Sequence, residues 1–296
     1  MDESEWLARR FDEHRAHLRA VGYRMLGSLS EADDALQDAW VRVSRADSSE
    51  VENLGGWFTT IVARVCLNML RSRSTRREEP LEVHLPDPVV SAEGAIQPED
   101  EALLSDSVGL ALQVVLDTLT PAERLAFVLH DMFDLPFEEI APMVGRTPTA
   151  TRQLASRARR RVKGAGRSRS EADAAHQREV VNAFCAAARG GDLEALVAAL
   201  DPDVVLRADF GPGRPAASRV IHGALAVAQQ ARLGASPAAE LHAVLVNGTP
   251  GMFVTMRGRP YVVMAFSITE GLIVEIDIVA DAERVRRAAT SVLSSN

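Results

Sequence analysis

Arginine side chains gathered in one segment are the residues of this sequence best suited to chemistry, and that chemistry is phosphate binding. Between Arg146 and Arg169 there are nine basic residues and no acidic ones, whereas Glu78 to Glu139 contains fifteen acidic residues and one basic residue, Arg124. A guanidinium group is planar and donates hydrogen bonds in a fixed fork, which suits phosphate oxygens and base edges. The net charge of −8 therefore does not exclude a nucleic-acid ligand, because the local field governs encounter with DNA.

These arginines belong to a segment whose pattern is typical of a helix-turn-helix. The first helix is indicated by apolar residues at the i, i+3, i+4 and i+7 positions of one face: Phe137, Ile140, Ala141 and Val144. Gly145 supplies a tight turn, and Thr147 followed by Pro148 predicts the N-cap and first residue of a second helix. In this motif the second helix enters the major groove of DNA.

The predicted second helix divides into two faces at about 100° per residue. One face is expected to pack against the first helix through Thr151, Leu154, Ala158 and Val162. The outward face carries the candidate DNA-binding residues Thr149, Arg152, Gln153, Ser156, Arg157 and Arg160. Arg152 and Gln153 suit base edges, and Arg157 and Arg160 suit phosphates. The alternative is a solvated basic helix packed on an acidic partner.

Residues 6–77 are predicted to form three helices that would position further charged groups. The first covers about residues 6–26 and is expected to end at Gly27 and Ser28. The second covers residues 31–43, with Ser30 as its N-cap and Asp33 in its first turn. The third covers about residues 56–71 and leads into a run of arginines at positions 71, 73, 76 and 77.

Composition predicts five parts in the chain. Residues 1–77 form one helical module, and 101–163 form a second that contains the helix-turn-helix. Between them, residues 78–100 form an acidic, proline-interrupted linker that cannot hold a long helix. Residues 164–170 form a short Gly/Ser/Arg linker. Residues 171–296 then form an α+β domain.

Within this last part the patterns predict helices before strands. Helices are expected at about residues 172–189 and 192–200, with Asp192 as an N-cap, and at 222–233. A short strand is expected at 204–208, and four later strands at 241–246, 252–256, 261–268 and 272–279. Gly248, Gly258 and Gly271 fall in the turns of this antiparallel meander.

Two separate stretches resemble the extracytoplasmic-function (group IV) sigma factors of bacterial RNA polymerase. Residues 119–124 and 128–130, followed by the helix-turn-helix, are similar to the family's region 4, and residues 30–43 and 56–71 are similar to its region 2. The resemblance implies a subunit that binds core RNA polymerase and directs promoter-specific initiation of transcription. In related factors the linker between the two regions runs through the RNA-exit path, where a flexible polyanion can mimic nucleic acid.

The resemblance also implies roles for individual residues. The recognition helix would read the minus-thirty-five element as duplex DNA. The polymerase would be bound by Asp34, Gln37 and Asp38, for which a plain solvated acidic face is the alternative. The minus-ten element would be melted and read by Asn53, Trp57, Thr60, Arg64, Asn68, Arg71 and Arg73, with phosphates also held by Arg76 and Arg77. Trp57 could equally be a core residue.

Residues 171–290 resemble the SnoaL-like fold, a cone of curved sheet wrapped by helices, in residues 191–196, 201–204 and 221–223 and in the late strands. A subset of the sigma family carries this domain, so the fold class is a multi-domain one: all-α region 2 and region 4 modules followed by an α+β SnoaL-like cone. The resemblance implies that the cone modulates the sigma factor in cis. Its regulatory loop would comprise Asp209, Gly211, Gly213, Arg214 and Asp281, although residues 209–214 and 279–284 both depart from the usual motifs.

A repressor and an enzyme are the two alternatives to a sigma factor. A one-component repressor with a ligand-sensing cone would lack a minus-ten module. An enzyme would need an acid/base pair, for which Asp209, His222, His242 and Asp277 are the candidates if they converge.

Neither cysteine, Cys66 or Cys185, has a second one at zinc spacing, so no metal and no cofactor is predicted. With no membrane-length apolar run and no signal peptide at the N-terminus, a cytoplasmic protein is expected.

Overall fold

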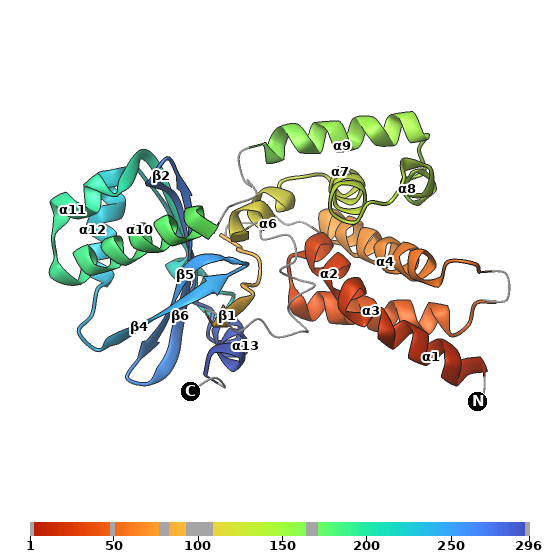
Figure 1. Cartoon of the computed structure of the whole chain (residues 1–296), viewed down its shortest axis with the longest axis horizontal. Helices are drawn as coiled ribbons and strands as arrows, with labels where there is room; N and C mark the ends of the chain where they lie inside the picture. The colour runs from red at the N-terminus through yellow and green to blue at the C-terminus, as the bar shows by residue number, and fades with distance from the viewer. Residues whose placement is uncertain (1–2, 48–50, 77–82, 93–108, 164–170, 294–296) are drawn as a thin grey trace. The chain divides into compact units, whose positions relative to one another are not determined.

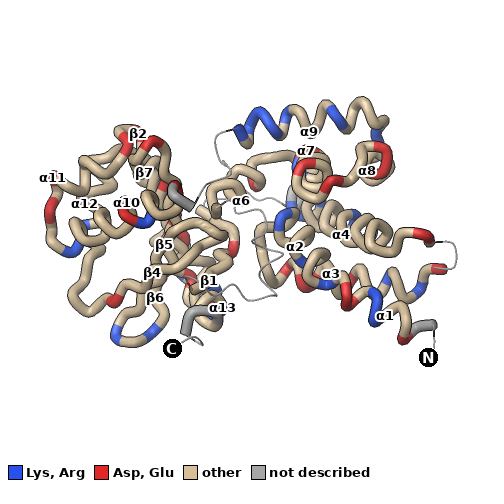
Figure 2. The backbone as a smooth tube through the Cα atoms, in the orientation of Figure 1, with Lys and Arg blue, Asp and Glu red and all other residues tan. Residues whose placement is uncertain are grey.

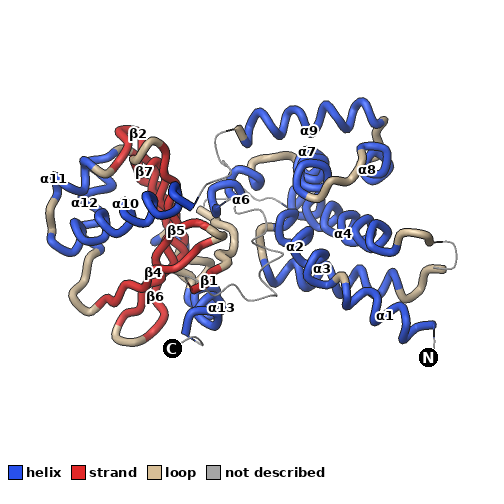
Figure 3. The backbone as a smooth tube through the Cα atoms, in the orientation of Figure 1, coloured by secondary structure: helices blue, strands red, loops and turns tan. Residues whose placement is uncertain are grey.

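The computed structural model describes residues 3–47, 51–76, 83–92, 109–163 and 171–293, and the chain forms two compact units (Figure 1). The first unit is helical, and the second combines helices with one sheet (Figure 3). Residues 85–92 and the beginning of the helix at residue 109 belong to the second unit. Across the described ranges, no helix combines the length and hydropathy that a bilayer crossing requires.

The first half of the helical unit contains α1 (Glu3–Glu13), α2 (Arg15–Leu26), α3 (Leu29–Val43) and α4 (Leu54–Arg76). The predicted first helix is therefore two helices, because the backbone breaks at His14. Gly27 ends α2 with a left-handed conformation at φ 75°, as expected of a glycine after a helix. Helices α2, α3 and α4 pack together around fully buried residues such as Leu18, Leu36 and Phe58.

The N-cap prediction for α3 is wrong by two residues. Ser28, not Ser30, has the extended backbone of an N-cap, and its hydroxyl accepts a hydrogen bond from the Glu31 N–H at 3.5 Å. Ser30 is already helical and exposed. Glu31 is therefore the acidic residue of the first turn, and Asp33 lies beyond it and pairs with Arg19 at 2.8 Å.

The second half of the helical unit contains α6 (Gly109–Asp117), α7 (Pro121–Phe127), a π-helical turn at Val128–Met132, α8 (Phe137–Val144) and α9 (Pro148–Val162). Gly145 turns the chain between α8 and α9 at φ 67°. Thr147 caps α9 by accepting from the Ala150 N–H at 3.2 Å, with Pro148 at the first helical position. The predicted helix-turn-helix is confirmed.

The second unit is built on a seven-stranded sheet of order β1-β4-β5-β6-β7-β2-β3. Its strands are β1 (Val90–Ala92), β2 (Leu200–Asp209), β3 (Arg219–His222), β4 (Ala239–Val246), β5 (Thr249–Met256), β6 (Arg259–Thr269) and β7 (Leu272–Val279). The predicted β4–β7 meander is confirmed, and Gly248, Gly258 and Gly271 have positive φ in its turns. Strand β2 pairs with β7 in parallel, which completes the curved sheet.

Helices α10 (Glu171–Gly190), α11 (Leu193–Ala198) and α12 (Ala224–Gly234) cover one face of this sheet around a core that includes Phe184, Leu196 and Ile276 (Figure 1). Asp192 caps α11 as predicted, accepting from the Ala195 N–H at 3.0 Å. Helix α13 (Ala282–Leu293) packs against β1 and β6.

Three elements of this unit were not predicted: β1, β3 and α13. His222 lies in β3 rather than in a helix, which begins only at Ala224 because Gly223 has a φ of 87°. Strand β1 lies within the acidic linker, and it pairs antiparallel with β4 from Val90 opposite Val246 to Ala92 opposite Val244. Part of the linker is therefore a sheet strand.

Replacing Ser28 by alanine should destabilise the helical unit, and replacing Ser30 should not. The Ser28 hydroxyl satisfies a backbone N–H of the first turn of α3, and losing a serine cap costs about 1 kcal/mol. Ser30 is on the exposed helix surface, where alanine has the better helix propensity. Thermal unfolding of the two variants, followed by circular dichroism, measures the difference. Equal losses in Ser28→Ala and Ser30→Ala would contradict the assignment of the cap.

Candidate functional site

The outward face of α9 has the exposure that a DNA-reading surface needs. The six predicted residues Thr149, Arg152, Gln153, Ser156, Arg157 and Arg160 are all exposed. On the opposite face Thr151, Leu154 and Ala158 are buried against the rest of the unit. The guanidinium of Arg152 lies 5.1 Å from the ring centroid of Phe137 in α8, a cation–π contact that orients its head. Basic residues follow one another along α9 (Figure 2).

Carboxylates of the same unit hold three arginines in the last turns of α9. The Glu123 carboxylate, on α7, accepts from Arg157 Nε at 2.9 Å and from Arg161 at 3.1 Å. The Asp131 carboxylate accepts from Arg159 Nε at 2.5 Å. Arg160 has no carboxylate within ion-pair distance in the described part of the chain. Arg160 is therefore the freer of the two candidate phosphate ligands, whereas Arg157 also links α9 to α7.

Glu123 connects the recognition helix to α7 and to the turn before it. It forms a capping box with Thr120, whose backbone N–H and hydroxyl both donate to the carboxylate. Burial of Glu123 by itself raises its pKa, but hydrogen bonds from Arg157 and Thr120 and the charge of Arg161 outweigh this and lower the pKa. The carboxylate is therefore charged at neutral pH, and its charge holds α9 in place.

The candidate minus-ten residues form one stripe along α4. Trp57, Thr60, Arg64, Asn68 and Arg71 recur every three or four residues and so share one face. Arg64, Asn68 and Arg71 are exposed, and Thr60 is half-buried. The indole of Trp57 is half-buried, with its ring centroid 5.4 Å from that of Phe58. Trp57 is thus packed on one side and accessible on the other.

Two other residues of the predicted set have structural partners. The side-chain oxygen of Asn53 accepts from the Gly56 N–H at 3.0 Å at the start of α4. Arg73 pairs with Glu31 and donates to the Leu26 carbonyl at 3.3 Å. Arg77 lies outside the described residues, and of Arg76 only the backbone is described.

The candidate polymerase-binding residues lie together on α3. Asp34, Gln37 and Asp38 are all exposed, and neither aspartate has a basic partner within ion-pair distance among the described residues. Asp34 and Gln37 also line a hollow with residues of α1, among them Phe11. An unpaired carboxylate pair at i, i+4 on a helix face suits a partner that carries arginine.

In the second unit, the predicted regulatory loop surrounds a buried ionic cluster. Asp209, 1% exposed, accepts from the Gly211 N–H at 2.8 Å and from the Arg284 guanidinium at 2.7 Å. Asp281 caps α13 by accepting from the Arg284 N–H at 2.9 Å. Gly211 has a φ of 72°, and a Cβ there would overlap the Asp281 carboxylate. Gly213 and Arg214 are exposed and take no part in the cluster in the described structure, although the Arg214 guanidinium lies 5.3 Å from the Phe210 ring.

The cluster also holds the linker between the two helical modules. Arg284 donates to Asp87 at 2.5 Å and to the carbonyls of Leu85 and Pro86 at 2.5 and 2.6 Å. The Leu85 N–H donates to Asp209 at 2.9 Å. We call the residues Leu85, Pro86, Asp87, Asp209 and Arg284 the linker clasp. The clasp residues are all buried, so solvent screens their charges little.

The turn between β4 and β5 adds backbone contacts to both sides of the linker. Asn247 Oδ1 accepts from the Val89 N–H at 3.0 Å, and the Asn247 N–H donates to the Val89 carbonyl at 2.7 Å. The Asn247 carbonyl accepts from the Gly109 N–H, at the start of α6, at 3.2 Å. One turn of the sheet therefore binds the chain both before and after residues 93–108.

The four acid/base candidates do not form a common site. Asp209 belongs to the clasp, and Asp277 pairs with Arg207 at 3.0 Å. His242 Nε2 lies 3.2 Å from the Thr255 hydroxyl, and His222 is exposed at the end of β3. Burial raises the pKa of Asp277 to about 6, although the charge of Arg207 opposes this. Asp209, Asp277 and His242 each have a different partner and His222 is exposed, so the described residues show no acid/base pair among these candidates.

Comparison with known proteins decides the family. Residues 10–76 match Sigma-70 region 2, and residues 109–162 match Sigma-70 region 4. The chain is 36% identical over 269 residues to the probable ECF RNA polymerase sigma factor SigI of Mycobacterium tuberculosis, covering 90% of each chain. The chain belongs to the extracytoplasmic-function (ECF) sigma factors. It is 38% identical over 251 residues to SigJ of the same organism, covering 82% of this chain and 79% of SigJ.

The solved structure of M. tuberculosis SigJ extends this likeness to the whole sigma factor. It superposes with a TM-score of 0.73 at 31% identity and covers 94% of this chain and 98% of SigJ. The C-terminal cone therefore belongs to the shared architecture. The predicted family and fold class, helical region 2 and region 4 modules followed by a SnoaL-like domain, are confirmed.

Sequence reasoning missed the residues that hold the arginines and the linker. Glu123 had a local signal, since a threonine three residues before a glutamate predicts a capping box. Arg284 lies three residues after Asp281, but nothing local indicates that it points to residues 85–87. Asp87 and Asn247 likewise gave no local signal of their contacts.

The Glu123 contacts predict a pH-dependent stability of the sigma factor's helical unit. A carboxylate with a lowered pKa contributes stability above its unfolded pKa of about 4.3 and loses it as the pH falls through the folded value. At pH 7 Glu123→Gln should cost about 1 kcal/mol, a modest value because Arg157 and Arg161 are half exposed.

This difference between wild type and Glu123→Gln should shrink as the pH falls from about 4.3 through the lowered pKa of Glu123 in the folded state, below which both side chains are uncharged. Chemical denaturation at a series of pH values measures it. Glu138→Gln, at an exposed position of α8, is the matched control and should track the wild type. A Glu123→Gln loss that stayed constant down to pH 3 would contradict the electrostatic origin.

Proposed function

We propose that this ECF sigma factor reads the minus-thirty-five element with α9 and the minus-ten element with α4, and that its cone controls access to both by holding the linker. The exposed reading face of α9 and the polar stripe on α4 support the first part. The linker clasp supports the second and is the observation on which the regulatory proposal rests. Core RNA polymerase would dock on Asp34, Gln37 and Asp38.

The helical unit must open before both elements can be read. Roughly 25 base pairs separate elements at minus ten and minus thirty-five, which is about 85 Å of duplex at 3.4 Å per step. In the structure α4 contacts α8, and α8 contacts α9. Packed helices lie about 8–10 Å apart, so α4 and α9 are separated by only about 20 Å. The observed packing of regions 2 and 4 is thus a closed state.

Polar contacts stabilise this closed state. The Gln113 amide, on α6, donates to the carbonyls of Tyr23 and Arg24 at 3.0 and 3.2 Å. Arg124 Nε, on α7, donates to the Arg24 carbonyl at 3.0 Å. These are buried carbonyls near the end of α2, and buried hydrogen bonds of this kind contribute on the order of 1 kcal/mol each. Polymerase and promoter contacts would have to outweigh them.

The linker connects the clasp to this opening. Residues 85–91 are buried in the second unit, and the linker is also the only covalent path from region 2 to region 4. A linker held by the clasp cannot extend between two modules that move apart to span a promoter. We therefore assign regulation in cis, rather than catalysis, to the cone, and we expect the protein to act in the cytoplasm with the polymerase. A one-component repressor does not need a region 2 module, so this alternative is not favoured.

Variants of α9 should separate base reading from phosphate binding. In transcription by core polymerase supplemented with this sigma factor, Gln153→Ala should relax base preference at one promoter position by about 1–3 kcal/mol. Arg160→Ala should weaken all promoters similarly and reduce the salt dependence of binding by about one ion. Arg257→Ala, on an exposed turn of the cone, is the control. If Gln153→Ala and Arg160→Ala behaved like the control, α9 would not be the reading helix.

Weakening the clasp from the linker side should raise transcription. Asp87→Asn keeps the size of the side chain but removes the charge that faces Arg284, and it leaves Asp209 to neutralise the guanidinium. At limiting core polymerase we expect several-fold more initiation, because the linker is released more easily. Asp203→Asn, at an exposed position of β2, should have no effect. Unchanged or reduced initiation by Asp87→Asn would contradict autoinhibition by the clasp.

A further inference from the structure

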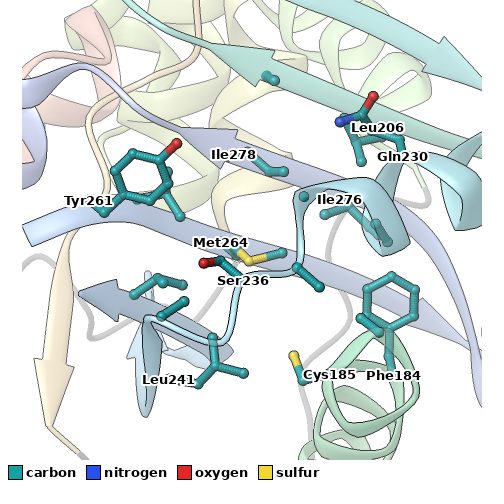
Figure 4. A pocket seen from close by; sticks show the side chains of 18 of the residues that line it. Phe184, Cys185, Leu206, Gln230, Ser236, Leu241, Tyr261, Met264, Ile276 and Ile278 are labelled. Atoms are coloured by element: carbon teal, nitrogen blue, oxygen red, sulfur yellow. The ribbon is translucent and has the colours of Figure 1, made fainter. Parts of the chain in front are cut away.

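The cone encloses a cavity that no part of the sigma function accounts for. Its volume is about 220 Å³, and it lies between α10, α12 and the inner face of the sheet. Figure 4 shows Phe184 of α10 and Ile276 of β7 on one side of the cavity and Tyr261 on the other; Phe184 is 2% exposed and Tyr261 is 45% exposed, so the cavity is nearer to solvent at Tyr261. An apolar interior that opens to solvent, here near Tyr261, is typical of small-molecule sites.

The charged residues of this cavity are all of one sign. Its lining residues, which all belong to the described chain, include two arginines, Arg189 of α10 and Arg219 of β3, and no aspartate or glutamate. Neither guanidinium has a carboxylate within ion-pair distance among the described residues. Both are exposed, so they belong to the solvent-facing part of the lining rather than to the apolar interior. The cavity therefore combines an apolar body with an entrance that attracts anions.

The described lining of the cavity contains no carboxylate or histidine for acid/base catalysis. Along β2 and β7 successive side chains alternate between the two faces of the sheet. Leu206 and Ile276 line the cavity, whereas Arg207 and Asp277 pair with each other on the opposite face. The thiol of Cys185 faces the cavity, but burial raises its pKa to about 11 in spite of the nearby charge of Arg189, so it is not a thiolate. The site is suited to binding.

One residue connects the cavity to the linker clasp. The Phe210 ring lines the cavity, and the preceding residue, Asp209, accepts the hydrogen bonds from Leu85 and Arg284. The Arg219 guanidinium lies 6.0 Å from the same ring. A ligand that contacts Arg219 and Phe210 would therefore act one peptide unit away from the carboxylate that holds the linker.

We propose that the cavity binds a small organic anion with an apolar body, its carboxylate at Arg219 and Arg189, and that occupancy alters the hold of the clasp on the linker through Phe210. The regulatory half of this inference rests on the proposed function of the clasp. The binding half does not, because it concerns only the cone. An apolar carboxylate matches the apolar lining of the cavity and the positive charge of its two arginines.

Calorimetric titration of the full chain tests whether the cavity binds such an anion. The ligands are decanoate and naphthoate, and each is compared with a neutral counterpart, decanol or naphthol. We expect the carboxylates to bind about tenfold more tightly than the neutral compounds, and Arg219→Gln to remove this difference while the neutral compounds bind as before. Ala231→Phe, which places a ring in the cavity from α12, should abolish binding of both kinds. Arg232→Gln, the next residue on α12 but outside the cavity, should bind like the wild type.

The outcomes distinguish the two halves. Equal affinity for the neutral and anionic compounds, or no binding of any of them at millimolar concentration, overturns the binding proposal. If the carboxylates bind as expected, transcription at limiting polymerase should change at least twofold on adding them to the wild type, and not with Ala231→Phe. Binding without a change in transcription, while Asp87→Asn does raise it, overturns the coupling through Phe210. If Asp87→Asn is also silent, the proposed role of the clasp fails and the cavity stands as a binding site alone.

Discussion

A buried guanidinium that needs two carboxylates organises the regulatory part of this sigma factor. Arg284 is 9% exposed, and removing an arginine from water is costly unless opposite charges and hydrogen-bond acceptors surround it. The cone supplies one carboxylate, Asp209, and the linker supplies the second, Asp87, together with two carbonyls. The linker is therefore a partner that the cone requires, and its release leaves Arg284 with unmet donors unless water or another anion takes its place.

Ion pairs also distinguish the two ends of helix α9. Within the part of the chain that the structure describes, the early turns of α9 present residues without carboxylate partners to solvent, whereas the late turns form ion pairs with Glu123 and Asp131. A helix fixed at one end by ion pairs keeps its reading side chains in register with the turn at Gly145. Arginines held in this way lose some capacity to neutralise phosphates, since part of their charge is already compensated. The ion pairs thus fix the orientation of α9, and they reduce the positive charge that its late turns could offer to DNA.

The elements that the sequence predicted well are those whose signals are local. The turn at Gly145, the cap at Thr147 and the two faces of α9 depend on residues within a few positions of one another, and all were confirmed. The confusion of Ser28 with Ser30 shows the limit of such signals, because both serines precede an acidic helix and only the backbone of Ser28 is extended. Strand β1 had no alternating pattern of its own, and it exists because β4 offers an edge to pair with.

The clasp lay beyond sequence reasoning for a different physical reason. Arg284 and Asp87 are 197 residues apart, and neither has a sequence neighbour that indicates the other as its partner. Only the parallel pairing of β2 with β7, itself without a local signature, places Asp209 beside the start of α13, where Asp281 orients Arg284.

The parallel pairing of β2 with β7 also explains how one domain can both line a cavity and contact the linker. Because side chains alternate along a strand, the last residues of β2 alternate between the cavity and the opposite face, from Leu206 and Ala208 on one side to Arg207 on the other. The chain then leaves the strand at Asp209 and Phe210, which contact the linker and the cavity respectively. A shift of this short segment moves both residues together, since a planar peptide unit joins them. Sheet geometry therefore places a residue that lines the cavity directly beside a residue that holds the linker between the region 2 and region 4 modules.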